Sequence, residues 1–251
     1  MNEKLTYPPE TYCQLFLTLY AQLNGPESME PVLEQKGRSY HARIWCSRGE
    51  ALEKAGLTLL HITHQDADGP RFVRHFETVI HPNNPRVPGV VVVIGQEYLE
   101  RADRRRIYCL VDLWRTTRRP NGKAVDQFRQ AIEGVCQDYE SSYSRLHQAL
   151  PPLQLCGGNG GNAGIFYSEF DPADIPFIDQ IVRCVVSEIP LIVESCQRSS
   201  PSVQDFMERN EIRREFLAWA LNQNPGNQRA VAAGVPWTVF EAFAFPPEVH
   251  Y

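Results

Sequence analysis

The sequence contains seven cysteines in 251 residues, yet none of them stand in the Cys-x-x-Cys spacing of redox and zinc motifs. Their odd number and wide scatter fit reduced thiols in a cytosol better than a disulfide framework or a zinc cage. The chain also lacks any apolar run near the ~18 residues of a membrane span, and its first residues lack the apolar core of a signal peptide. We therefore expect a cytoplasmic protein without a metal site or a membrane partner.

An excess of positive charge is missing as well, because the formal net charge is -5. A non-specific nucleic-acid binder needs Lys and Arg over a whole face, so we expect no nucleic-acid partner. The basic run Arg101–Arg106 is the local exception, and we interpret it as a solvated loop or strand approach, with anion binding as the alternative. The apolar content of 43% suffices for a substantial core, which favours a single domain over residues 1–251.

Five segments between about residue 39 and residue 115 have the composition of β-strands. They are rich in β-branched and aromatic residues, and Gly, Pro, Asp or Asn bounds each of them. Their connections are mostly too short for crossover helices, which favours antiparallel pairing. The expected strands are Tyr40–Cys46, Leu57–Thr63, Phe72–Ile80, Val87–Gln96 and Arg106–Trp114.

Helices are expected on both sides of this region, which makes the fold class α+β. Apolar residues recur at helical spacing over residues 9–24, 124–150 and 175–196. The Gly-rich segment 156–164 predicts a loop beside a site, leading into a strand at Ile165–Phe170. The last third is expected to contain a helix, a strand near Glu215–Leu221 and a final helical stretch at Trp237–Ala244.

Asp112 is the most informative polar residue because it interrupts the apolar strand Ile107–Trp114. A carboxylate in such a strand is costly unless it is paired or used in chemistry, so a structural and a catalytic role both stay open. His81 stands before Pro-Asn-Asn-Pro, where we expect its ring to bond to a backbone carbonyl and fix the turn. His61 and His64 are three residues apart in a strand and face opposite sides, which argues against a shared metal.

Several short motifs occur in an order that resembles the oxygen-dependent coproporphyrinogen III oxidases. Each motif is weak by itself, but together they cover nearly the whole chain in collinear order. They are Glu53–Gly56 (Glu-Lys-Ala-Gly), Val79–Pro88 (Val-Ile-His-Pro-Asn-Asn-Pro-Arg-Val-Pro), Asp112-Leu113, Ala163–Glu169 (Ala-Gly-Ile-Phe-Tyr-Ser-Glu) and Ile189–Leu191 (Ile-Pro-Leu).

The resemblance implies a large, flat antiparallel sheet flanked by helices on both faces, usually assembled as a homodimer. It also implies oxidation by O₂ without a metal or an organic cofactor, in which a carboxylate holds or removes the pyrrole N–H proton. Asp112 matches the family's sheet aspartate that is credited with this contact, so the resemblance favours a catalytic role for Asp112.

The chain departs from the family at positions of polar site residues. Val91 and Gly95 stand in the substrate strand, Asn159 begins the stretch that replaces an arginine-led loop, and Asn222 stands near the C-terminal strand position. The replacements Val91, Val93, Cys109 and Val111 predict a smaller and more apolar pocket than one that holds four propionates.

The leading hypothesis is therefore a cofactor-independent, O₂-using oxidase of an electron-rich aromatic carboxylate: an indole, pyrrole or phenol. Asp112 would hold the heteroatom proton, and Arg115 would neutralise a carboxylate or superoxide-like charge. One alternative is coproporphyrinogen oxidation with relocated arginines. Another is a non-catalytic binder of a tetrapyrrole. The arginines considered for relocation are Arg43, Arg48, Arg71, Arg74 and Arg106.

Overall fold

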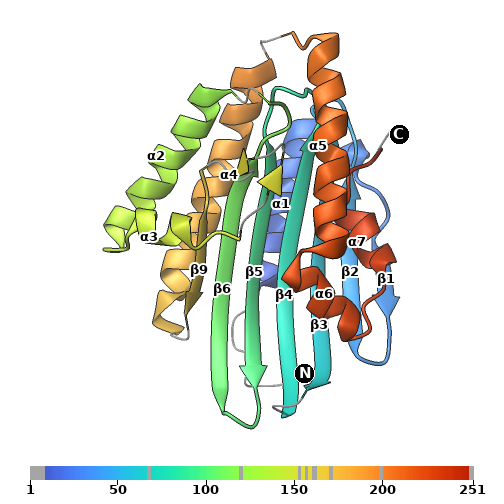
Figure 1. Cartoon of the computed structure of the whole chain (residues 1–251), viewed down its shortest axis with the longest axis vertical. Coiled ribbons are helices and arrows are strands. Elements are labelled where there is room, and N and C mark those ends of the chain that lie inside the picture. The colour runs from blue at the N-terminus through green and yellow to red at the C-terminus, as the bar shows by residue number, and fades with distance from the viewer. Residues whose placement is uncertain are drawn as a thin grey trace.

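The computed structural model describes residues 9–66, 69–118, 121–151, 154–155, 158–159, 163–169, 172–197 and 200–248. Its centre is a seven-stranded antiparallel sheet in the order β1-β2-β3-β4-β5-β6-β9 (Figure 1). The first six strands are neighbours in both sequence and space, because hairpin connections join them. The strands are β1 (Leu33–Lys36), β2 (Tyr40–Ser47), β3 (Leu52–Asp66), β4 (Gly69–Pro82), β5 (Gly89–Leu99), β6 (Arg104–Trp114) and β9 (Ile165–Glu169).

All five strands expected between residues 39 and 115 are confirmed, as is the strand after the Gly-rich segment. Most are longer than their apolar cores, because polar residues extend them beyond the helices that cover the sheet. β1 was not predicted, since Leu-Glu-Gln-Lys is short and mostly polar. Two further strands of two residues each, β7 (Gln154–Leu155) and β8 (Gly158–Asn159), pair with one another outside the main sheet.

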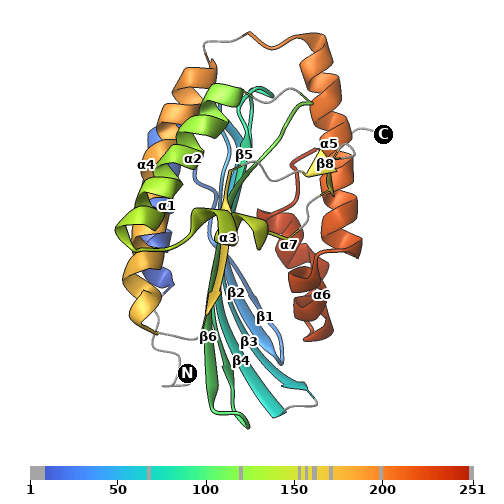
Figure 2. The ribbon, with the colours of Figure 1, turned by 60° about the vertical axis from the view of Figure 1, so that its left-hand side comes forward.

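Helices cover both faces of the sheet, as expected (Figure 2). One face carries the first, second and fourth helices, and the other carries the last three. A short helix, α3, packs beside β9. The helices are α1 (Glu10–Asn24), α2 (Gly122–Asp138), α3 (Tyr143–Gln148), α4 (Ile175–Gln197), α5 (Val203–Asn222), α6 (Pro225–Ala232) and α7 (Trp237–Phe243), with 3₁₀ turns at Pro26–Ser28 and Pro172–Asp174.

Two expectations about the helices were wrong. The helix expected over residues 124–150 is two helices, because Glu140 adopts a left-handed conformation (φ 53°) and the Ser142 side chain caps the N-terminus of α3. The strand expected at Glu215–Leu221 is part of α5. A capping box between Ser202 and Asp205 starts this helix, and its buried residues recur at helical spacing.

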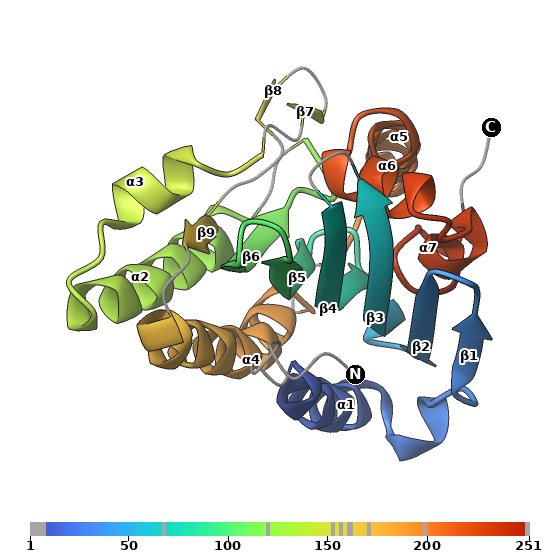
Figure 3. The ribbon, with the colours of Figure 1, turned by 90° about the horizontal axis from the view of Figure 1, so that it is seen from below.

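The two faces of the sheet contribute to two separate apolar cores. Side chains of β3–β6 and β9 pack against α1, α2 and α4 in the larger core. The smaller core joins β2, β3 and the end of β6 to the last three helices. Figures 1 and 3 show α5, α6 and α7 gathered over the β2–β4 side of the sheet. Within the described residues, no helix is long and apolar enough to cross a membrane.

Candidate functional site

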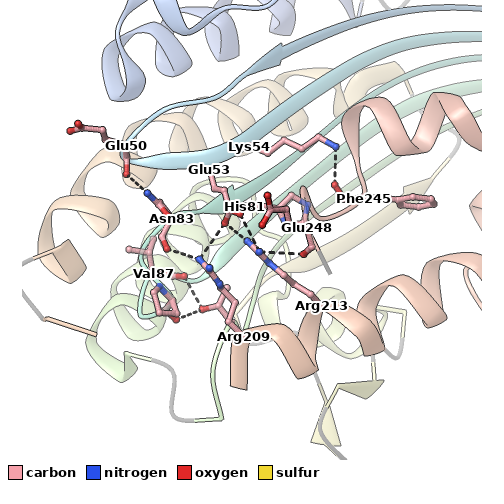
Figure 4. Close-up of polar contacts among 12 residues, drawn as sticks. Glu50, Glu53, Lys54, His81, Asn83, Val87, Arg209, Arg213, Phe245 and Glu248 are labelled. Carbon is pink, nitrogen blue, oxygen red and sulfur yellow. Dashed lines mark hydrogen bonds and ion pairs between the residues drawn. The ribbon is translucent and has the colours of Figure 1, made fainter. Parts of the chain in front are cut away.

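Two of the motifs that carry the resemblance meet in the structure. β3 and β4 pair so that Lys54 stands opposite His81, which brings Glu53–Gly56 beside the start of Val79–Pro88. The side chains of Glu53, Lys54 and His81 all point toward the C-terminal helices (Figure 4). Their contacts therefore show what these motifs do in this fold.

Lys54 and His81 both bind backbone carbonyl groups at the end of α7. The Lys54 ammonium donates to the carbonyls of Glu241 (2.7 Å) and Phe245 (2.8 Å), and the His81 Nε2–H donates to the carbonyl of Ala244 (2.9 Å). These carbonyls have no amide partner inside the helix, so cationic and N–H donors there stabilise its end. Burial lowers the pKa of His81 to about 3 and that of Lys54 to about 8.

Glu53 holds α5 through two arginines. Its carboxylate forms a two-pronged ion pair with Arg213, and its Oε2 lies 3.2 Å from Nη1 of Arg209. Arg209 also donates to the carbonyl of Asn83 (2.6 Å) in the turn after β4 (Figure 4). Arg213 is 8% exposed, so this pair lies in the interior, where removal of one partner costs several kcal/mol.

The motif residues therefore anchor the C-terminal helices to the sheet. The expectation that His81 bonds to a backbone carbonyl is confirmed. A cavity beside His81, Trp114 and Phe216 has room for about one water molecule, which is too small for an aromatic ligand. The chemistry of a candidate site has to come from another part of the sheet.

The half-exposed part of the sheet lies on the same face, over β4, β5, β6 and β9. Along these strands most residues that face α1, α2 and α4 are buried, whereas most of the alternate residues below the level of Asp112 are partly exposed. We call this tract the open face. No described helix crosses β5 or β6 on this side in Figure 1. Its residues are Arg71, Val73, His75, Glu77, Val91, Val93, Gly95, Glu97, Arg106, Tyr108, Leu110, Phe166 and Ser168.

A hydrogen-bonded chain of three side chains crosses the open face. The Tyr108 hydroxyl lies 3.0 Å from Nδ1 of His75, and Nε2 of His75 lies 3.0 Å from Oε2 of Glu77. Gly95 stands between Tyr108 and His75 in the register of the three strands. A Cβ atom at Gly95 would lie 2.1 Å from the Tyr108 hydroxyl, so the glycine makes the tyrosine's path across β5 possible.

The burial of Tyr108 and the nearby charges of Glu97 and Glu77 raise its pKa, so its hydroxyl is protonated at neutral pH. Nδ1 of neutral His75 can therefore accept the hydrogen bond and the proton of the phenol while its Nε2–H donates to the Glu77 carboxylate. When His75 is protonated, its Nδ1–H donates to the Tyr108 oxygen, and the phenol proton becomes available to a ligand. This arrangement can transfer protons to or from a molecule that rests on the open face.

Two arginines flank the chain. Arg71 lies 3.1 Å from Glu97, whereas Arg106 reaches the same carboxylate only at 4.0 Å. The Arg106 Nε–H donates to the Ser168 hydroxyl (2.7 Å), and its guanidinium lies over the Tyr108 ring at 5.9 Å from the centroid. Arg106 is about one third exposed and is only loosely bound to Glu97, so it is well placed to receive a ligand carboxylate beside the proton chain.

Asp112 lies on the same face near the end of β6, directly opposite Val91, and is 6% exposed. Its Oδ1 accepts the backbone N–H groups of Leu113 (2.9 Å), Gly164 (2.8 Å) and Ala163 (3.3 Å). Charge-assisted bonds of this kind provide the stabilisation that a buried carboxylate needs. Asp112 is therefore paired, as a structural carboxylate would be, and its catalytic role stays a prediction.

The peptide at Ala163–Gly164 is held from its other side as well. Tyr143 of α3 donates to the carbonyl of Ala163 (3.0 Å), and Nδ1–H of His147 donates to the carbonyl of Gly164 (2.8 Å). A Cβ at Gly164 would lie 1.9 Å from the carbonyl oxygen of Val111, so only glycine permits this approach. Asp112, Tyr143 and His147 together fix the chain where it enters β9.

The other predicted site residues do not gather around Asp112. Val91 borders it, but Cys109 faces the opposite side of the sheet, in the core under the helices. Asn222 is exposed at the end of α5, and its amide donates to the carbonyl of Ala218. Asn159 has its backbone in β8, outside the main sheet. Arg115 follows β6 directly and is half-buried.

The sequence did contain a signal for the residues that were missed. His75 and Glu77 are two residues apart in a strand and so share a face. Tyr108 and Asp112 are four residues apart in one strand, so their side chains also lie on the same face as each other. A glycine inside the apolar strand around Gly95 is typical of a close approach by another group. Among the arginines proposed for relocation, the structure places Arg71 and Arg106 on the open face, whereas Arg74 binds Glu10 on the opposite side.

Comparison with known proteins adds no assignment, because no family model matches the chain. No curated protein matches it either. Among the described residues, no group of three His, Cys, Asp or Glu side chains could hold a metal ion.

Proposed function

We propose that the chain is a cofactor-independent oxidase that uses O₂ to oxidise an electron-rich aromatic carboxylate on the open face. A pyrrole, an indole or a phenol has the required chemistry. The observation that carries the proposal is the Tyr108–His75–Glu77 chain beside Arg106 on a partly apolar surface. The resemblance of the collinear motifs to coproporphyrinogen III oxidases supports the same class of reaction.

In this proposal each polar group has one role. Arg106 binds the substrate carboxylate, and Val93 and Leu110 support the ring as apolar neighbours on the open face. Tyr108 and His75 take the proton of the ring N–H or O–H, and a second proton leaves a carbon of the substrate, so that the substrate loses two electrons and two protons in all. O₂ accepts these two electrons and two protons, and H₂O₂ leaves. Asp112 holds the wall at Ala163–Gly164, in place of the direct proton contact that the sequence suggested.

The test uses a panel of indole, pyrrole and phenol carboxylates with an oxygen electrode and a peroxide assay. We expect O₂ consumption with at least one compound, and a loss of about 10²-fold or more in kcat for His75→Ala, since general acid–base catalysis contributes roughly this much. His61→Ala, a half-buried histidine on the opposite face of the sheet, serves as the matched control and should keep most of its activity.

Binding of a ligand without its conversion would show that the chain is a carrier and not an enzyme. A spectral titration with porphyrins and with linear and cyclic pyrrole carboxylates distinguishes the two. Ligand binding that Arg106→Gln weakens, with no O₂ uptake for any compound, would assign the open face to ligand binding alone. Conversion of anaerobically reduced coproporphyrinogen in air to CO₂ and a vinyl product would instead assign the haem-pathway reaction.

A further inference from the structure

A groove of about 400 Å³ lies between the first edge of the sheet and α7. β1 and β2 form its floor, α7 forms one wall, and its volume falls within the roughly 300–1,000 Å³ of small-molecule sites. β3 separates these two strands from the strands of the open face (Figure 3). We call it the edge groove, and its lining includes Leu33, Ile44, Cys46, Arg48, Glu241 and Ala242.

The floor of the edge groove is mostly apolar. The register of β1 and β2 places Leu33 beside Ile44, and both line the groove together with Ala242 of α7. Cys46 is 5% exposed, and its burial raises the pKa of the thiol to about 11, so this floor residue is neutral. Leu33 is 43% exposed, so a ligand with an apolar side chain removes apolar surface from water when it binds here.

Two charged side chains of the edge groove have capacity left for a ligand. The Nε–H of Arg48 donates to Glu30 (2.7 Å), but no acceptor among the described residues bonds to the two terminal nitrogens of its guanidinium. The Glu241 carboxylate likewise has no hydrogen-bond or ion-pair partner within the part of the chain that the structure describes. Lys54 donates to the backbone carbonyl of Glu241 and not to its side chain.

The chemistry of the ligand follows from these three features. The terminal N–H groups of Arg48 match a carboxylate, and the Glu241 carboxylate matches an ammonium group. A ligand with only one of the two charges leaves the other side chain without a partner, so the groove discriminates in favour of a zwitterion. A free α-amino acid with a large apolar side chain combines both charges with a group that fits the floor.

We propose that the edge groove binds a free α-amino acid with an apolar or aromatic side chain. Arg48 binds its carboxylate and Glu241 binds its ammonium group. Leu33, Ile44 and Ala242 contact its side chain. The two charged groups are exposed at the mouth of the groove, so binding is weak, with a Kd on the order of 1 mM. This site does not depend on the chemistry proposed for the open face.

The experiment is an NMR titration of the ¹⁵N-labelled full chain with L-phenylalanine up to about 20 mM. We expect saturable shifts of amides in β1, β2 and α7, away from the open face. Three matched probes each lack one feature: N-acetyl-L-phenylalanine lacks the ammonium group, L-phenylalaninamide lacks the carboxylate, and L-alanine lacks the large side chain. Each is expected to bind about fivefold more weakly or worse, because each loses one of the three contacts.

Two variants connect each ligand group with its partner in the groove. In Glu241→Gln, L-phenylalanine and its N-acetyl derivative should bind within about twofold of one another, whereas the amide still binds more weakly. Arg48→Gln should show the reverse pattern, with L-phenylalanine and its amide nearly equal. Glu100→Gln, an exposed charge change at the turn between β5 and β6, is the control and should keep the wild-type pattern.

The crossed pattern of the two variants is the result that supports the proposal, because a general effect of net charge would not depend on which ligand group is blocked. The absence of saturable shifts in β1, β2 and α7 with L-phenylalanine at about 20 mM would overturn it. So would wild-type binding of the N-acetyl or the amide probe as tight as that of L-phenylalanine, since a zwitterion would then not be required. Circular dichroism of each variant checks that its fold is intact.

Discussion

The Tyr108 hydroxyl and Nδ1 of His75 lie 3.0 Å apart, although β5 separates their strands. The contact exists because Gly95 leaves the space above β5 empty. A glycine that first looked like the loss of a polar substrate contact is therefore the residue that brings two polar side chains together. The relationship places the candidate chemistry on the sheet itself, away from the motifs that carry the resemblance.

Gly95→Ala tests this contact. The new methyl group would lie 2.1 Å from the Tyr108 hydroxyl and should turn the ring away from His75. We expect a changed near-UV circular dichroism signal and a loss of activity or ligand binding similar to that of Tyr108→Phe. Gly134→Ala in α2 is the matched control, because nothing lies within 4 Å of its Cβ position. It should stabilise the chain by about 0.5–1 kcal/mol.

Asp112 can be assigned by comparing two substitutions. Asp112→Asn keeps an oxygen acceptor for the N–H groups of Ala163 and Gly164, whereas Asp112→Ala leaves these donors without it. If Asp112 is structural, the Ala variant should lose about 2–4 kcal/mol of unfolding free energy and the Asn variant much less. Urea denaturation measures both. A fully folded Asn variant that has lost all activity would show that the carboxylate itself takes part in the reaction.

The pair between Glu53 and Arg213 should dominate the attachment of α5. Glu53→Ala leaves the buried guanidinium of Arg213 and the half-buried one of Arg209 without their carboxylate, and we expect a loss of about 3–5 kcal/mol. Limited proteolysis should then cut between the sheet and α5 sooner than in the wild type. The control is Glu50→Ala, since the Glu50 side chain is exposed. Equal stability of the two variants would contradict the anchoring role.

His81 should make the fold sensitive to acid. Its pKa is about 3 in the folded chain, against an ordinary value of 6.5, because the buried ring resists protonation. The unfolded chain therefore binds more protons between pH 6.5 and pH 3, and stability falls as the pH drops through this window. At pH 4.5 the expected contribution is roughly 2–3 kcal/mol, since one pKa unit corresponds to about 1.4 kcal/mol.

His81→Gln gives the measurement for this prediction. Glutamine keeps an N–H donor for the carbonyl of Ala244 but does not titrate. Denaturation midpoints of the wild type and the variant should converge as the pH falls from 6.5 toward 4. Parallel pH curves would show that the acid sensitivity comes from other groups.

Much of the sheet could be predicted because its signals are local. The strands between residues 39 and 115 stand out by β-branched composition and turn residues, and hairpin connections leave them antiparallel. The strand expected near Glu215–Leu221 failed because its apolar residues fit either period, and the capping box that decides for a helix lies about ten residues earlier. Cys109 was assigned to the pocket, although it stands three residues from Asp112 in the same strand and its side chain therefore points to the opposite face of the sheet.

The candidate site depended on contacts between distant residues. The partners of Asp112 at Ala163 and Gly164 lie 51 and 52 residues away, and those of Glu53 at Arg213 lie 160 residues away. By itself, the sequence determined the α+β class, most strands and the alternation that assigns each strand residue to a face, since these follow from local composition and a two-residue period. Only the tertiary structure decided which faces are covered and which polar groups meet, because these depend on register and on long-range packing.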